Sequence, residues 1–544
     1  MLLSVLILFV SLCGAWAAYS WYCLLLNYLR ARKFGIPLRV IPISHENPLW
    51  MVVDKKIFIP LFERLPFGNG NFTRYNWRGW EFADKYRSHF EMGDLFMLVT
   101  PGRNWLYVCS PDILLDVFQR KSDFPRPLEL FEMVNVFGPN LSTTDGPTWQ
   151  KHRKITASCF NEQNNEIVWS ESVVQARDML RYWSTNSPVN STADDTRTLS
   201  LNVLSSAGFG KSYKFQGHNE ESLGNVATSY KESLQTILDN CILLMVLGTR
   251  LLSFEYLPVK LRTLYQATVT FKQYMTEVYE NEKRAIAKGK PTGRNLMTSL
   301  IRASQENGEP GQQDGGLTES EIYGNIFVFN FAGHDTTAHT LAFAVVLLAF
   351  AVVLLAASPS VQDWISQELH CVLGDRPTED WNYVHDFPRL KRCQAVLMET
   401  LRLYTPVPIA KSTGEKHGNS EFAIQISRYL KIHSLEWRPS RWINTEDPDE
   451  SLRNETITTP QKGSFVAWSE GVRICPGKKF SQVEFVASIA GLFRDWRVEP
   501  VLQKGEDLRM ARKRVMELVE KDTGQVLLLQ MLHPERAPLI WRKR

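Results

Sequence analysis

The stretch from Trp468 to Phe480, WSEGVRICPGKKF, places a single cysteine, Cys475, between two glycines and beside a proline, with basic residues on both sides. No second cysteine lies near enough to form a zinc knuckle or a redox pair. The next segment, KKFSQVEFVASIAGLF, has a helical pattern, so Cys475 would lie at a helix N-terminus, where backbone N–H groups stabilise a thiolate. Gly471 and Gly477 would let a planar partner approach the backbone, and Arg473 could supply positive charge. A lone thiolate in this setting describes the axial ligand of a haem iron, and the alternative is an inert buried cysteine.

The composition limits the classes of protein that the chain can represent. It has 544 residues, of which 44% are hydrophobic and 22% are charged, as in globular proteins with several cores or one unusually large core. The net charge of +4 is small for this length and argues against nucleic-acid binding. Its eight cysteines are scattered, with no C-x-x-C pair, which argues against a disulfide framework and predicts reduced thiols. No Gly-rich nucleotide-binding motif lies at a predicted strand–helix junction.

The amino terminus predicts a membrane anchor. Residues Leu2–Asn27 are almost wholly apolar and carry no charge, and this length suffices for a helix that crosses a bilayer. The basic segment 30–33 follows and would hold that end in the cytoplasm. No positively charged segment precedes the apolar run, which favours a retained anchor over a cleaved signal peptide. The predicted division is an anchor over 1–28, a proline-containing linker over 29–60 and one large domain over 61–544.

The rest of the chain is predicted to be predominantly helical with a few short strands. The segment GDLFMLVTPGRNWLYVCS, residues 93–110, has the pattern of a β-hairpin with Pro101 and Gly102 in its turn. From residue 148 to about residue 300 the pattern is mainly helical.

A long apolar helix is predicted from Thr318 to Ala357, because Thr318 and Glu321 have capping-box spacing and Pro359 follows the run. Within it LAFAVVL, residues 341–347, is repeated without a gap at 348–354. Seven residues are nearly two helical turns, so the repeat would lengthen the helix by about 10 Å and keep its buried face buried. A helix buried on all sides is favoured, and a second membrane span over 341–357 is the alternative.

Four motifs together identify a family. WSEGVRICPG resembles the cysteine-ligand loop F-x-x-G-x-R-x-C-x-G of the cytochrome P-450 superfamily, with Trp468 in place of the phenylalanine that shields the sulfur. Glu399 and Arg402 match the family's E-x-x-R, and Arg441 in WRPSRW, residues 437–442, matches the third member of a charged structural triad.

The other two motifs imply contacts to the cofactor and to oxygen. AGHDTT, residues 332–337, resembles the oxygen motif A-G-x-[DE]-T-T, which implies that Thr336 donates a hydrogen bond to bound dioxygen and that Asp335 helps to deliver protons. Trp149 and Arg153 match W-x-x-x-R, which implies hydrogen bonds to the haem propionates.

The resemblance implies a mainly α fold with small β-sheets, the cytochrome P-450 prism, preceded by a single transmembrane helix. It also implies haem b bound through Cys475 and insertion of one oxygen atom of O2 into a small apolar substrate. Electrons would come from NADPH–cytochrome P-450 reductase, with cytochrome b5 as a second candidate donor, on a basic face around Arg473, Lys478 and Lys479. The domain would face the cytosol from the endoplasmic reticulum membrane. Together with CFNEQNN, residues 159–165, these motifs look most like fungal enzymes of specialised metabolism.

Two segments depart from the family pattern: the repeat over 341–354, and residues 403–436, which are shorter than in relatives by about one strand and its following helix. Two other functions therefore stay open. One is a haem-thiolate isomerase or dehydratase that needs no reductase, and the other is a haem-deficient, inactive relative. Substrate contacts are expected around Arg126–Leu141 and Ile242–Leu257.

Overall fold

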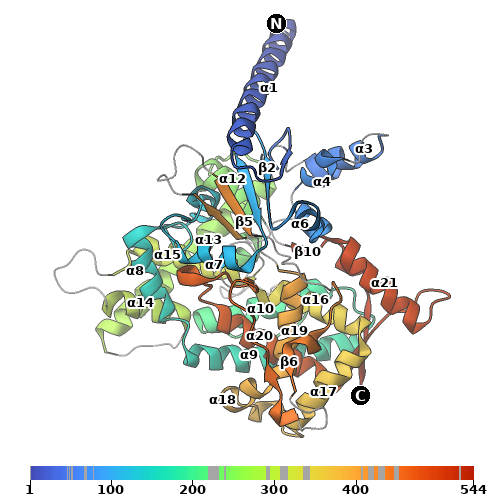
Figure 1. The fold of residues 1–544 in the computed structure, drawn as a ribbon. Coiled ribbons are helices and arrows are strands. Elements are labelled where there is room, and N and C mark those ends of the chain that lie inside the picture. Colours follow the sequence, from blue (N-terminus) through green and yellow to red (C-terminus); the bar gives the residue numbers. More distant parts are fainter. Residues whose placement is uncertain are drawn as a thin grey trace.

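The computed structural model describes residues 2–45, 47, 50, 53–65, 70–77, 79–218, 232–237, 240–289, 295–306, 316–334, 343–405, 409–413, 422–426, 435–445, 452–525 and 529–544. Its longer helices are α1 (Leu2–Arg32), α7 (Pro111–Gln119), α8 (Gly146–Ala157), α9 (Glu162–Thr185), α10 (Thr192–Phe209), α12 (Cys241–Leu252), α13 (Val259–Ala287), α14 (Leu296–Glu306), α15 (Glu319–His334), α16 (Phe343–Ala357), α17 (Pro359–Leu373), α19 (Lys391–Leu403), α20 (Lys478–Phe493) and α21 (Leu508–Lys521). The shorter helices are α3 (Ile59–Glu63), α4 (Asn71–Tyr75), α5 (Trp80–Asp84), α6 (Arg87–Met92) and α18 (Tyr383–Asp386). Figure 1 shows α1 projecting from a large helical body.

The helical body is built around α20, which packs along α9. Buried side chains lie on every side of α20, because it lies in the middle of the core. Gly491 permits close packing against α9, since a Cβ at this position would lie 2.9 Å from the Cβ of Ala176. The helix that follows the cysteine loop is therefore held rigidly, and it fixes the position of Cys475.

Helix α16 contains the described part of the repeated apolar segment. Residues 348–356 are buried, none of them more than 7% exposed, and they pack against α10, α19, α20 and α21. The prediction of a helix buried on all sides is confirmed for these residues. Residues 335–342 lie outside the described residues, so the prediction of one continuous helix from Thr318 to Ala357 stays a prediction.

Among the described residues no single helix has both the length and the hydropathy of a membrane span. Leu348–Ala357 and Pro359–Leu373 have them only as a pair bent by 113°.

The strands form one five-stranded sheet in the order β1-β2-β3-β5-β4 and three two-stranded sheets. The hairpin predicted over 93–110 is confirmed, because β2 and β3 are antiparallel with Leu95 opposite Val108. The large sheet consists of β1 (Leu38–Val40), β2 (Leu95–Val99), β3 (Asn104–Val108), β4 (Ile409–Ser412) and β5 (Phe422–Ile426). The small sheets pair β6 (Ile443–Asn444) with β7 (Thr456–Ile457), β8 (Trp496–Pro500) with β11 (Leu539–Lys543), and β9 (Thr523–Gln525) with β10 (Leu529–Met531).

The carboxyl end of α1 is docked on this sheet. Leu24 and Ala31 are buried against the β2–β3 hairpin, while Leu12 and Trp16, nearer the amino terminus, are exposed. The Asn27 side-chain amide donates a hydrogen bond to the carbonyl oxygen of Thr100 at 2.9 Å, and the Asn104 side chain donates one to the carbonyl oxygen of Asn27 at 3.1 Å. Strand β1 then pairs with β2, so regular structure continues into the segment predicted as a linker.

Candidate active site

The cysteine loop presents Cys475 at the amino terminus of α20, as the sequence predicts. Cys475 is 4% exposed, its N–H donates to the carbonyl oxygen of Trp468 at 2.9 Å, and its sulfur accepts a hydrogen bond from the N–H of Gly477. Gly471 has φ +74°, and a Cβ there would lie 3.2 Å from the carbonyl oxygen of Phe118. The left-handed backbone and the neighbouring segment therefore require a glycine at this position. The sequence predicted a different reason, namely room for a planar partner.

The charge of the Cys475 sulfur depends on burial and on two cations. Burial raises the pKa of the Cys475 thiol to about 12, and the N–H of Gly477 and the charges of Arg153 and Lys478 act in the opposite direction. Arg473, which was also expected to supply positive charge, forms an ion pair with Asp145. Protein groups alone favour the protonated thiol, so a thiolate here needs a cationic partner such as a metal ion on the sulfur.

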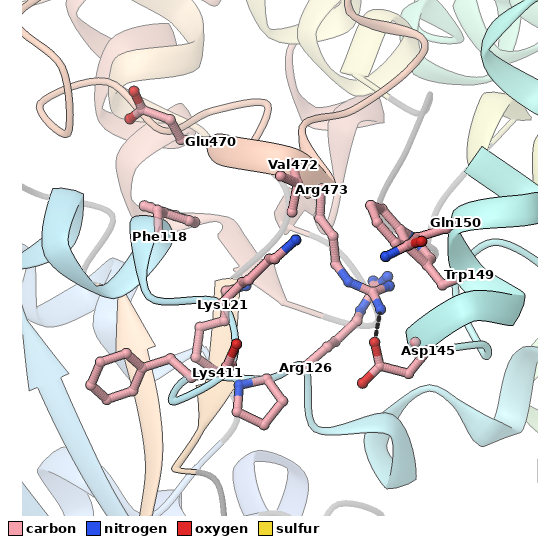
Figure 2. Close-up of a pocket in the computed structure, with 14 residues that line it drawn as sticks. Phe118, Lys121, Arg126, Asp145, Trp149, Gln150, Lys411, Glu470, Val472 and Arg473 are labelled. Carbon is pink, nitrogen blue, oxygen red and sulfur yellow. Dashed lines mark hydrogen bonds and ion pairs between the residues drawn. The ribbon is translucent and has the colours of Figure 1, made fainter. Parts of the chain in front are cut away.

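A basic pocket lies beside this loop (Figure 2), with a cavity of about 250 Å³. Arg473 donates to the Asp145 carboxylate at 2.5 Å, and its guanidinium lies 4.4 Å from the centroid of the Trp149 ring. Arg126 and Lys411 line the same cavity, whereas Cys475 is not among its lining residues.

Cations outnumber carboxylates in this pocket. Burial, then repulsion from Arg473, lowers the pKa of Arg126 to about 9. Burial, then repulsion from Arg126 and Arg473, lowers the pKa of Lys411 to about 8. Arg473 Nη1 is buried and has no hydrogen-bond partner among the described residues. An unsatisfied donor within a group of buried cations fits a ligand with carboxylates, such as haem with its two propionates.

The sequence singled out Arg126 only as the start of the expected substrate-contact segment Arg126–Leu141, and it did not single out Lys411. Arg126 follows α7 in a segment without regular structure, and Lys411 lies in β4. Neither residue belongs to a local motif. Arg126 is one of three basic residues in the segment 120–127, and Lys411 is the one basic residue of β4.

Helix α8 carries the residues of W-x-x-x-R. Trp149 lines the basic pocket, and Arg153 lies close enough to Cys475 and Arg473 for their charges to affect its pKa. Burial lowers the pKa of Arg153, and the negative charge of a Cys475 thiolate raises it. The structure therefore brings Trp149, Arg153, Arg473 and Cys475 to one side of the core.

The predicted triad forms a closed ionic cluster around Glu399, which is fully buried. Arg402 donates to this carboxylate at 2.7 Å and Arg441 at 2.8 Å. The indole of Trp442 at 2.9 Å and the backbone N–H of Arg438 at 2.7 Å also donate to it, and the sequence predicted neither contact. The carboxylate is surrounded by donors, which agrees with the structural role implied by the resemblance.

Helix α15 begins with the predicted capping box. The Thr318 N–H donates to the Glu321 carboxylate at 2.8 Å, and the Glu321 N–H donates to the Thr318 hydroxyl at 3.2 Å. The predicted oxygen-motif residues Asp335 and Thr336 lie outside the described residues.

Comparisons with known proteins agree with these features. The sequence model of the cytochrome P-450 family matches residues 60–425, more than half of the chain. A cytochrome P-450 monooxygenase of Arthrobotrys oligospora is 26% identical over 96% of this chain and 96% of its own length. A phomenoic acid biosynthesis cluster cytochrome P-450 monooxygenase of Leptosphaeria maculans is 29% identical over 91% of this chain and 92% of its own length. A cytochrome P-450 monooxygenase of Penicillium roqueforti is 26% identical over 89% of this chain and 90% of its own length. The chain therefore belongs to the cytochrome P-450 family and is an oxidoreductase of its haem-thiolate monooxygenase class.

Proposed function

We propose that this chain hydroxylates or otherwise oxidises a small apolar compound in fungal specialised metabolism, with Cys475 as the axial ligand of haem b. The observation that carries the proposal is the buried thiol at a helix N-terminus beside a pocket in which cations outnumber carboxylates. One oxygen atom of O2 enters the substrate and the other leaves as water, and the balance needs two electrons and two protons. The Leptosphaeria relative, named for a biosynthesis cluster, supports a role in specialised metabolism.

The chain's own residues have three tasks in this function. The haem, when bound, supplies the redox chemistry that activates O2. Cys475 provides the sulfur ligand, and the N–H of Gly477, with Arg153 and Lys478, stabilises its negative charge. The second task is to bind the propionates. We assign it to Trp149 and Arg153, as the resemblance implies, and to the pocket cations Arg126, Lys411 and Arg473. The third, delivery of protons, is assigned to Asp335 and Thr336 by the resemblance.

Electrons are proposed to come from NADPH through cytochrome P-450 reductase, with cytochrome b5 as a second donor. Lys478 and Lys479 are exposed beside the cysteine loop and support an acidic docking partner on this face. Arg473 is turned inward to Asp145, so we omit it from the docking surface predicted earlier.

Helix α1 is proposed to anchor the chain in the endoplasmic reticulum membrane, with the domain in the cytosol. Large apolar side chains are exposed along it, including Leu12, Trp16 and Trp21. Because Leu24 is already buried against the sheet, the bilayer would surround the part of α1 that precedes it. Loss of microsomal sedimentation on removal of residues 2–20 would support this anchor.

The absorption spectrum of the reduced, carbon monoxide-bound protein tests the haem ligand. We expect the long-wavelength Soret band typical of thiolate ligation in the wild-type chain and its loss in Cys475→Ala. Cys159→Ala is the matched control, because Cys159 is also buried but does not belong to the cysteine loop, and it should keep the band. A normal band in Cys475→Ala would exclude Cys475 as the ligand.

A further inference from the structure

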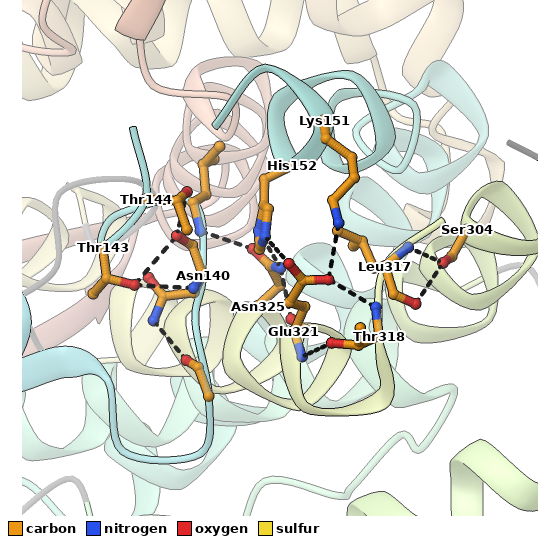
Figure 3. Close-up of polar contacts among 12 residues, drawn as sticks. Asn140, Thr143, Thr144, Lys151, His152, Ser304, Leu317, Thr318, Glu321 and Asn325 are labelled. Atoms are coloured by element: carbon orange, nitrogen blue, oxygen red, sulfur yellow. Dashed lines mark hydrogen bonds and ion pairs between the residues drawn. The ribbon is translucent and has the colours of Figure 1, made fainter. Parts of the chain in front are cut away.

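A buried histidine with no role in the proposed reaction connects the helix of W-x-x-x-R to the helix of the oxygen motif. His152 lies on α8 and is fully buried. Its Nε2 lies 3.1 Å from the Glu321 carboxylate and its Nδ1 lies 2.9 Å from the side-chain nitrogen of Asn325, and both partners belong to α15. Lys151 donates to the other oxygen of Glu321 at 3.2 Å (Figure 3).

The neighbours of Asn325 determine which nitrogen of His152 carries the proton. The Asn325 side-chain oxygen accepts the backbone N–H of Leu141 at 3.0 Å, so its NH2 group faces His152. That NH2 group also donates to the carbonyl oxygen of Glu321 at 2.7 Å. An NH2 group can only donate, so Nδ1 of His152 accepts and Nε2–H donates to Glu321. The imidazole is therefore neutral with one defined tautomer, which agrees with its burial.

The same network holds the loop before α8 against α15. The loop backbone lies directly on the helix, because a Cβ at Gly324 would lie 2.2 Å from the carbonyl oxygen of Gly138. Just before this contact, the Phe137 ring packs against Phe327 of α15 with a centroid distance of 5.0 Å. One amide, Asn325, thus joins the loop to α15 through Leu141 and to α8 through His152.

We propose that His152 and Asn325 are positioning residues that hold α8, the loop 137–141 and α15 in one arrangement, and that this arrangement sets the size of ligand that the site would accept when haem is bound. The inference rests on the proposed haem-thiolate function. Both side chains act through other groups, since neither is among the residues proposed to bind haem. A shift of any one of the three elements would leave a buried polar atom without its partner, so the arrangement is strongly preferred.

Two substitutions at His152 separate the hydrogen bonds from the volume of the side chain. Gln can accept from Asn325 and donate to Glu321, whereas Leu has a similar volume and can do neither. Lys154→Leu is the matched control, because Lys154 lies on the same helix and is exposed. The full-length chain in detergent is studied with two measurements, of which only the second needs bound haem.

The first measurement is hydrogen exchange of peptides that contain Leu141. We expect exchange to accelerate about tenfold or more in His152→Leu, and to stay near the wild-type rate in His152→Gln and Lys154→Leu. Asn325→Ser, which removes the acceptor of the Leu141 N–H, should accelerate it as well. The proposal would be overturned if the Leu141 N–H kept its wild-type protection in His152→Leu or in Asn325→Ser, provided that the variant folds. This holds even if haem is bound.

The second measurement is the Soret titration with imidazole and with the larger 4-phenylimidazole. His152→Leu should weaken 4-phenylimidazole binding about tenfold while changing imidazole binding less than about threefold, and His152→Gln should restore the wild-type ratio. A wild-type ratio in His152→Leu and Asn325→Ser would overturn the role in ligand selection. A wild-type chain without any Soret band would instead overturn the proposed function, and the ligand-selection part of the inference with it.

Discussion

The Glu399 cluster and the basic pocket are both buried ionic sites, but their charges are balanced in opposite ways. At Glu399 one carboxylate accepts from two arginines, an indole and a backbone N–H. In the basic pocket Arg126, Lys411 and Arg473 share Asp145, which is itself half exposed, and a guanidinium nitrogen of Arg473 has no partner among the described residues.

The difference separates a structural site from a binding site. Removal of any member of a closed cluster lowers the free energy of unfolding, because the remaining charges stay buried without a partner. In an open cluster of cations the members repel one another, and this repulsion destabilises the ligand-free site. An anionic ligand relieves the repulsion when it binds. We therefore expect Glu399 to contribute to folding, and we propose that the basic pocket contributes to ligand binding.

The largest expected effect is that of Glu399→Gln. The substitution would leave Arg402 and Arg441 buried without a carboxylate, and the free energy of unfolding should fall by about 3–5 kcal/mol. Urea unfolding followed by circular dichroism measures this change. Glu517→Gln removes an exposed carboxylate paired with Lys521 and should leave the midpoint near its wild-type value. Equal midpoints for wild type and Glu399→Gln would contradict a structural role for the cluster.

Arg473→Gln should affect the bound haem far more than the fold. Its partner Asp145 is accessible to water after the substitution, and the repulsion acting on Arg126 and Lys411 decreases. We expect haem transfer to apomyoglobin to accelerate about tenfold, because a buried donor to a carboxylate is lost. The stability of the haem-free protein should change by less than about 1 kcal/mol.

Lys121→Gln provides the control for Arg473→Gln. Lys121 lines the same cavity but is exposed, so its loss should change the transfer rate less than about threefold. The comparison between the two sites would fail if Arg473→Gln lowered stability as much as Glu399→Gln and left haem transfer unchanged.

The sequence predicted those parts of this comparison that are local in the chain. Glu399 and Arg402 lie one helical turn apart, and Cys475 directly precedes an apolar helix, so short patterns identify them. Arg126 and Lys411 meet only because β4 passes near the segment after α7, where the Ser412 N–H donates to the carbonyl oxygen of Pro125. Contacts of this kind depend on the tertiary fold and have no local signal.

The same distinction explains the outcomes elsewhere in the fold. The hairpin of β2 and β3 and the capping box of α15 were predicted correctly, because both depend on residues a few positions apart. Docking of α1 through Asn27 was not predicted, because its partner Thr100 is distant in the sequence. An asparagine at the end of an apolar run was the available signal, and its meaning required the position of the hairpin.

Glu484 provides a third kind of buried ionisable site, a carboxyl group for which the described residues provide no cation. It lies on α20, is 3% exposed, and accepts a hydrogen bond from the Ser200 hydroxyl. Burial raises the pKa of Glu484 to about 8, from an ordinary value of 4.5. The folded state therefore binds this proton more tightly than the unfolded state, and the resulting stability is lost as the pH rises from 4.5 toward 8.

Glu484→Gln should remove this pH dependence. Its effect on the free energy of unfolding should be smallest at low pH, where the wild-type carboxyl group is protonated and glutamine resembles it. Urea unfolding between about pH 6 and about pH 8 should then give a shallower decline in free energy than the wild-type chain. Glu506→Gln is the control of opposite sign: hydrogen bonding to Arg514 lowers the pKa of Glu506, so its contribution is constant over this range. If Glu484→Gln kept the wild-type slope, Glu484 would be ionised in the folded state. A buried carboxylate would then exist without a cation, and the contrast between the closed and the open cluster could no longer be explained by charge balance alone.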